Sequence, residues 1–96
     1  IRIKMLRPNT VWKHFKGSLA VILTLAKHSE TNESLVVYRC INGNGMPSFN
    51  HEDGIYARPL EMFLSEVDKE KYPECKQKYR FELIGSYGGW ALLNFK

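Results

Sequence analysis

Two runs of apolar residues stand out along the chain, and a polar segment separates them. Residues 19–26 and 35–41 are aliphatic, partly β-branched and of strand length. Residues 28–34 between them are polar throughout and rich in turn-forming side chains. The pattern predicts a β-hairpin with a long connection.

Shorter patterns predict further strands on both sides of this hairpin. Residues 10–15 follow a break at Pro8 and Asn9, and residues 55–58 lead to Pro59. Residues 79–84 alternate, so that Tyr79, Phe81 and Leu83 share one face and are expected to close the sheet. Residues 90–95 form a last apolar stretch that we expect to dock as a strand or a short helix.

The remaining segments carry helix, turn and linker signals. Apolar residues at positions 60, 63, 64 and 67 have helical spacing, and Pro59 suits a first helical turn, which predicts one or two turns of helix. Residues 1–9 suggest an edge strand or a loose tail, and Gly85, Gly88 and Gly89 suggest turns. The charged residues 68–78 suggest a solvated linker, to which we assign no chemistry.

Together these elements predict one mainly β domain over residues 1–96. Its expected fold is a small SH3-like barrel or a curled antiparallel sheet with one short helix. The net charge is +4 and the pI about 9.2, which suits anionic partners but equally suits solubility alone. No apolar run is long enough to span a bilayer, and two cysteines make no disulfide framework, so we expect a cytoplasmic protein without membrane contact.

Five short sequence blocks occur in an order that resembles one known family. They are WKHFKG at 12–17, AKHSET at 26–31, VVYR at 36–39, ARPLEMF at 57–63 and YRF at 79–81. The chain resembles the domain-of-unknown-function family numbered 1653, which implies a compact β-rich fold of bacteria or their phages and no assigned activity. The family-like core would then be 12–84, with an N-terminal arm at 1–9 and a C-terminal extension at 85–96. The loop at 42–54 looks longer than is usual in the family.

Metal and nucleophile signals are weak. His14, His28, His51, Cys40 and Cys75 are scattered, without the short spacing of a zinc site, so we expect no metal and no cofactor. Cys40 lies within a predicted strand, where a thiol is usually inert packing, and Cys75 lies in a charged, partly exposed segment. A nucleophile elbow and a glycine-rich phosphate loop are both lacking, which favours a non-catalytic role.

Binding is the function that the residue pattern favours. Strand alternation places Trp12 and His14 on one face, separates Tyr38 from Arg39, and puts Tyr56 and Arg58 on the same side. The residues expected to bind a ligand are Trp12, His14, Lys16, His28, Arg39, Tyr56 and Arg58. Structural alternatives stay open: the aromatic rings could form the core, His28 could fix its turn, and Arg58 could pair with a glutamate such as Glu30, Glu33 or Glu61.

Two hypotheses of function follow. The first is a non-catalytic module for an anionic, ring-bearing ligand, a nucleotide or a nucleic-acid segment. The second is a protein-interaction domain, for example a phage-borne adaptor or anti-defence protein that sequesters a nucleotide signal or a host protein. Loop 42–54 and tail 90–95 motivate the second hypothesis. In either case we expect a monomer or a small homo-oligomer.

Overall fold

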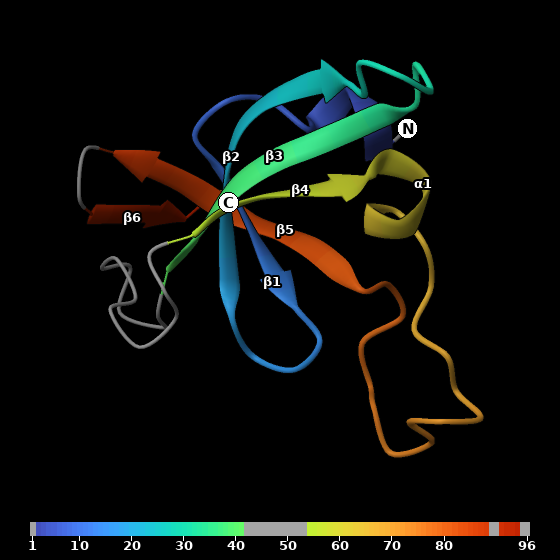
Figure 1. Cartoon of the computed structure of the whole chain (residues 1–96). Coiled ribbons are helices and arrows are strands. Elements are labelled where there is room, and N and C mark those ends of the chain that lie inside the picture. The colour runs from blue at the N-terminus through green and yellow to red at the C-terminus, as the bar shows by residue number, and fades with distance from the viewer. Residues whose placement is uncertain (1, 42–53, 89–90, 95–96) are drawn as a thin grey trace.

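The fold is a single curled antiparallel sheet (Figure 1). The computed structural model describes residues 2–41, 54–88 and 91–94. Its strands, in the sheet order β4-β3-β2-β1-β5-β6, are β1 (Thr10–His14), β2 (Leu19–Lys27), β3 (Ser34–Ile41), β4 (Ile55–Pro59), β5 (Phe81–Gly88) and β6 (Ala91–Asn94). The mainly β class is thus confirmed, as an unclosed curled sheet.

The predicted hairpin is formed by β2 and β3, which pair from Leu19 with Ile41 to Lys27 with Ser34. A bulge between Ile22 and Thr24 interrupts the register, and such bulges increase the local twist of a sheet. The turn at the far end is held by the His28 amide, which donates to the Glu33 carbonyl at 2.8 Å.

The sheet divides its apolar side chains between two faces, as strand alternation requires. The face with the larger cluster is called the inner face. Its cluster consists of sheet residues together with Leu6 and Phe63, which pack against them: Leu6, Trp12, Ala20, Ile22, Val36, Tyr38, Phe63 and Phe81. The outer face carries Val11, Leu19, Val21 and Ile41. Phe63 stacks on Phe81 with ring centroids 4.0 Å apart, so the aromatic core of the domain lies on the inner face.

The helix α1 (Leu60–Phe63) is one turn long and follows Pro59 at the end of β4 (Figure 1). The apolar spacing to Val67 suggested a second turn as well. Instead the chain after Leu64 is extended, because the Arg80 amide donates to the Ser65 carbonyl (3.0 Å) and the Val67 amide to the Lys78 carbonyl (2.8 Å). Val67 is still buried, but by strand-like pairing rather than by a helical face.

The N-terminal residues form a short 3-10 helix, η1 (Arg2–Met5), rather than an edge strand or a loose tail. The guanidinium of Arg2 lies 3.8 Å from the ring centroid of Tyr79 and 5.5 Å from that of Trp12. It also donates to the carbonyls of Leu64 (2.9 Å) and Phe81. Cation–π contacts and two carbonyl acceptors therefore fix a segment whose own sequence predicted only a weak element.

The charged segment 68–78 is not a free linker, as its composition had suggested. The Tyr72 ring packs edge-on against the Phe15 ring with centroids 4.9 Å apart, and the side-chain Nε2 atom of Gln77 donates to the Lys13 carbonyl at 2.9 Å. We call this segment the docked loop.

Gly85 and Gly88 do not form the turns that the sequence suggested, because both lie within β5 and pair with Val11 and Ala91. Gly89 is outside the described residues.

Candidate functional site

The curl of the sheet brings β4 over β5, although β3, β2 and β1 separate these strands in the sheet order. The guanidinium carbon of Arg58 on β4 lies 5.3 Å from the ring centroid of Phe81 on β5. The Arg58 Nε atom donates to the Tyr38 hydroxyl at 3.3 Å. Side chains from distant strands thus meet above the inner face and leave two adjoining cavities there.

The first cavity, which we call the sheet cavity, has a volume of about 300 Å³. Strands β3 and β4 contribute Tyr38, Cys40 and Arg58 to its walls. Strands β1 and β5 and the β1–β2 turn contribute His14, Phe81 and Lys16. Basic and aromatic side chains therefore line the same cavity.

The second cavity, which we call the loop cavity, has a volume of about 420 Å³ and lies between the sheet and the docked loop. It shares His14, Lys16 and Arg58 with the sheet cavity. The docked loop and the residue before β5 add further walls, among them Asp68, Lys71, Tyr72 and Arg80. Cations outnumber the single carboxylate, so the loop cavity favours an anion.

His14 sits where the two cavities meet. Its ring packs on Phe15 at 4.5 Å and on Phe81 at 4.8 Å, and its Nδ1 accepts a hydrogen bond from the Lys16 amide at 3.1 Å. Burial, with the nearby charges of Arg58, Lys16 and Arg80, lowers the pKa of His14 to about 4. Near neutral pH the ring is therefore uncharged, and because Nδ1 accepts, its proton is on Nε2, which is left as a donor.

Arg80 contributes a polar atom without a partner. Its Nε atom is buried and makes no hydrogen bond among the residues that the structure describes. Its guanidinium belongs to a side chain that lines the loop cavity. A buried donor without an acceptor costs about 1–3 kcal/mol.

The seven residues predicted to bind a ligand are not all brought together. His14, Lys16 and Arg58 line both cavities, and Tyr56, which pairs with Tyr38 across β3 and β4, has its ring 6.0 Å from the Tyr38 ring. The other three lie elsewhere: Trp12 within the core, His28 in the hairpin turn, and Arg39 on the outer face.

Two of these three side chains, Trp12 and His28, make hydrogen bonds within the domain. Trp12 is 1% exposed and its Nε1 donates to the Thr10 hydroxyl at 3.0 Å. The Nδ1 of His28 accepts from the amides of Glu30 (3.1 Å) and Thr31 (3.3 Å), which matches the turn-fixing alternative. The hydrogen bond of Arg58 described above goes to a tyrosine, and not to one of the glutamates considered from the sequence.

The wall residues that the sequence argument missed include Lys71, Tyr72 and Arg80. Lys71 and Tyr72 belong to the segment read as a linker, in which one aromatic residue among charges was the available signal. Arg80 lies between Tyr79 and Phe81 in a predicted strand, where alternation directs it away from the aromatic face. Nothing in the local sequence places it at a cavity.

The sheet cavity also brings Cys40 near His14, the pairing that a thiol nucleophile would require. Burial raises the pKa of Cys40, against an opposing effect of Arg58. The pKa of His14 is lowered at the same time, so a thiolate–imidazolium pair is disfavoured. Cys40 and Cys75 are both free thiols.

Two general features complete the description. Within residues 2–41, 54–88 and 91–94, no three histidine, cysteine or carboxylate side chains are grouped so as to hold a metal ion. In the same part of the chain, no helix has the length and apolar character needed to cross a bilayer.

The geometry defines a small β domain with a basic, ring-lined pair of cavities. A sequence model of the family described as "Protein of unknown function (DUF1653)" matches residues 10–83, and the chain belongs to that family. No curated protein and no solved structure matches the chain.

Proposed function

We propose that this domain is a cytoplasmic, non-catalytic module that binds an anionic, ring-bearing ligand, a nucleotide or a nucleic-acid segment. The sheet and loop cavities form its site. The observation that carries the proposal is the wall of His14, Lys16 and Arg58 that the two cavities share, with the further cations Lys71 and Arg80 lining the loop cavity.

The cations suit phosphate oxygens. A guanidinium offers five N–H donors, and the hydrogen bond to Tyr38 uses one donor of Arg58. Arginine binds phosphate through two parallel hydrogen bonds, and Lys16 and Lys71 would add point charges at the same cavity. His14, which is neutral near pH 7, would donate from Nε2 without adding a further charge to be desolvated.

The rings suit the apolar part of such a ligand. Phe81 and Tyr38 line the sheet cavity, and Phe15 and Tyr72 line the loop cavity. Both volumes lie within or near the range of about 300–1,000 Å³ that is usual for small-molecule sites. A flat heterocycle could therefore lie against a ring while its phosphate reaches Arg58 or Arg80.

Thermal unfolding of the whole chain against nucleotides, cyclic dinucleotides, short oligonucleotides and buffer anions tests the proposal. A ligand at 100 times its Kd adds about 2.7 kcal/mol to the free energy of unfolding, which raises Tm by about 10 °C or more in a domain of this size. Arg58→Ala should abolish the shift. Arg39→Ala changes the charge equally on the outer face and should preserve it.

A panel without any shift would reject the proposal and leave the protein-interaction hypothesis. The features that motivated that hypothesis are largely beyond the described residues. Loop 42–53 is not described, and of the tail only the backbone of β6 is. Among the residues that the structure describes, no specific contact favours a protein partner, a phage-borne adaptor role or the sequestering of a defence signal over the anionic ligand.

A further inference from the structure

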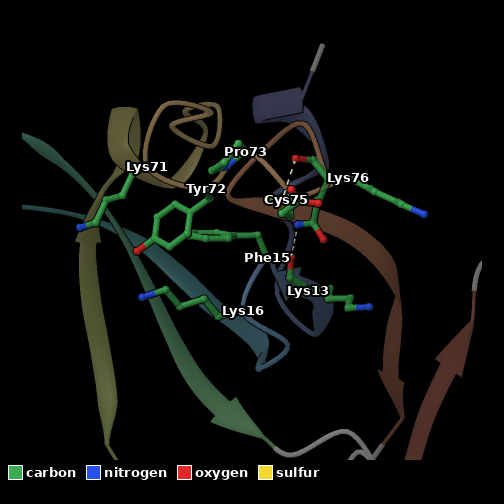
Figure 2. A pocket seen from close by; sticks show the side chains of 10 residues that line it. Lys13, Phe15, Lys16, Lys71, Tyr72, Pro73, Cys75 and Lys76 are labelled. Atoms are coloured by element: carbon green, nitrogen blue, oxygen red, sulfur yellow. Dashed lines mark hydrogen bonds between the residues drawn. The ribbon is translucent and has the colours of Figure 1, made fainter.

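We infer that the ligand is a single-stranded nucleic acid, held along a row of three cavities rather than in the inner two alone. This inference rests on the proposed function and specifies its ligand class. The third cavity, which we call the outer cavity, has a volume of about 650 Å³ and borders the Phe15–Tyr72 ring pair; Figure 2 shows the side chains that line it.

The ring pair forms a common wall. Phe15 and Tyr72 line both the outer cavity and the loop cavity, and their centroids are 4.9 Å apart at an interplanar angle of 64°. Both side chains are partly exposed. An aromatic ring between two basic cavities is the arrangement on which an unpaired base can stack while its flanking phosphates extend to either side.

Lysine side chains surround this ring pair. The Lys16 Nζ atom lies 5.3 Å from the Tyr72 centroid and 5.8 Å from that of Phe15, and the Lys71 Nζ atom lies 5.6 Å from that of Tyr72. Figure 2 shows both amino groups directed toward the hydroxyl end of Tyr72. The nearby amino group of Lys16 is the main reason that the pKa of Tyr72 is lowered.

The cations continue in both directions from this point. Lys13 and Lys76 line the outer cavity, and in Figure 2 both extend away from the ring pair on the side opposite Lys16 and Lys71. Arg58 and Arg80 line the loop cavity. Lys16 borders all three cavities, so the row is continuous from the outer cavity to the sheet cavity.

This succession fits a strand better than a single nucleotide. A mononucleotide presents its phosphates at one end and would leave Lys13 and Lys76 without an anion. A strand alternates phosphates with flat bases and would engage the outer cations, the ring pair and the inner arginines together. A duplex buries its base faces in its own stack, and an acidic peptide supplies charge without flat rings.

Fluorescence anisotropy with labelled oligothymidylates of one to eight nucleotides tests the inference on the whole chain. We expect the octamer to bind at least about tenfold more tightly than the mononucleotide, since an added stacked base gives a gain of this order. The logarithm of its affinity should fall with the logarithm of salt at a slope of about −2 to −3, for three to four neutralised phosphates.

Paired variants separate the outer cavity from the inner ones. Lys13→Ala with Lys76→Ala should reduce the octamer slope by about 1.4 and leave mononucleotide binding unchanged. Lys4→Ala with Lys27→Ala, at exposed positions outside all three cavities, removes the same charge and should change the slope by much less. Tyr72→Ala should weaken the octamer about tenfold, and Tyr72→Phe should restore most of this loss.

Three results would overturn the inference and leave the proposed function standing. One is equal affinity for the mononucleotide and the octamer. Another is tighter binding of a blunt duplex than of the single strand. The third is a full octamer affinity in both the Tyr72→Ala and the Lys13→Ala, Lys76→Ala proteins. Failure of every nucleotide and oligonucleotide to bind would instead reject the proposed function itself, and binding of polyglutamate alone would indicate an acidic protein partner.

Discussion

Arg58 and Phe81 contact each other across the inner face, with the guanidinium carbon 5.3 Å from the ring centroid. The two residues lie on β4 and β5, which are not hydrogen-bonded neighbours. The contact is possible because the sheet curls and brings these two strands face to face. Phe81 also meets Phe63 (4.0 Å), Tyr38 (5.9 Å) and His14 (4.8 Å), so this ring joins the core to the walls of the candidate site.

Replacing Arg58 should weaken the contact between β4 and β5. Arg58→Ala removes a partly buried cation–π contact and the hydrogen bond to Tyr38, which together predict a loss of about 1–2 kcal/mol in the free energy of unfolding and a drop in Tm of about 4–16 °C. Arg39→Ala, on the outer face of β3, should change stability by about 0.5 kcal/mol or less. Urea unfolding of both proteins measures the difference, and equal losses would contradict the closing role of Arg58.

His14 predicts a pH dependence of stability. Its pKa is about 4 in the folded protein and about 6.5 when unfolded, so between these values the unfolded chain binds more protons. Stability from this group is therefore complete above about pH 6.5 and is lost as the pH falls toward 4. Allowing for solvent screening of a partly exposed ring, we expect a loss of about 1–2 kcal/mol.

Urea unfolding at several pH values from 4.5 to 7.5 measures this loss. His14→Gln removes the titrating group and keeps a side chain that can accept and donate hydrogen bonds. Its stability should vary less over the same pH range than that of the unaltered protein. Parallel curves for the two proteins would show that another group dominates acid sensitivity.

Trp12 should behave as a core residue. Its ring is 1% exposed and meets Phe63 edge-on at 5.7 Å. Trp12→Ala should cost about 3–5 kcal/mol, a large part of the total stability of a small domain. Trp12→Phe should fold and retain the affinity for any ligand of the inner cavities, because Trp12 lines neither. A selective loss of affinity in folded Trp12→Phe protein would contradict this.

Cys40 should react slowly with thiol reagents. Burial raises its pKa, which leaves less thiolate at a given pH, and Arg58 opposes this only in part. In Cys75→Ser protein at pH 8, iodoacetamide should modify Cys40 several-fold more slowly than it modifies glutathione. A ligand in the sheet cavity should slow the reaction further. Modification of Cys40 at the rate of a free thiol would show that the thiolate is stabilised.

The strands were predictable because their signal is local. Aliphatic runs of strand length identified β2 and β3, and the alternation of side chains along a strand placed Tyr38 and Arg39 on opposite faces. The length of α1 was not predictable, since Ser65 and Val67 are held extended by Arg80 and Lys78, more than ten residues further along the chain. The same applies to Arg2, whose partners Tyr79 and Phe81 lie near the other end of the sequence.

The candidate site was predictable only in part, for a similar reason. Alternation correctly placed Trp12 and His14 on one face, but it cannot tell that α1 covers Trp12 through Phe63 while His14 borders a cavity. The outer and loop cavities exist because segment 68–78 folds back onto Phe15. The charged composition of segment 68–78 does not indicate that it packs against Phe15.

The closure between β4 and β5 is made by side chains and not by a backbone ladder. Separating these two strands breaks no hydrogen bond between them in the described sheet; it costs the contact of Arg58 with Phe81 and the packing of Phe81 against Phe63 and Tyr38. The opening of the sheet cavity is therefore bounded by side-chain contacts that converge on Phe81 of β5. Substitutions at Arg58 or Phe81 therefore change how β4 and β5 approach each other without removing any backbone hydrogen bond of the β2–β3 ladder.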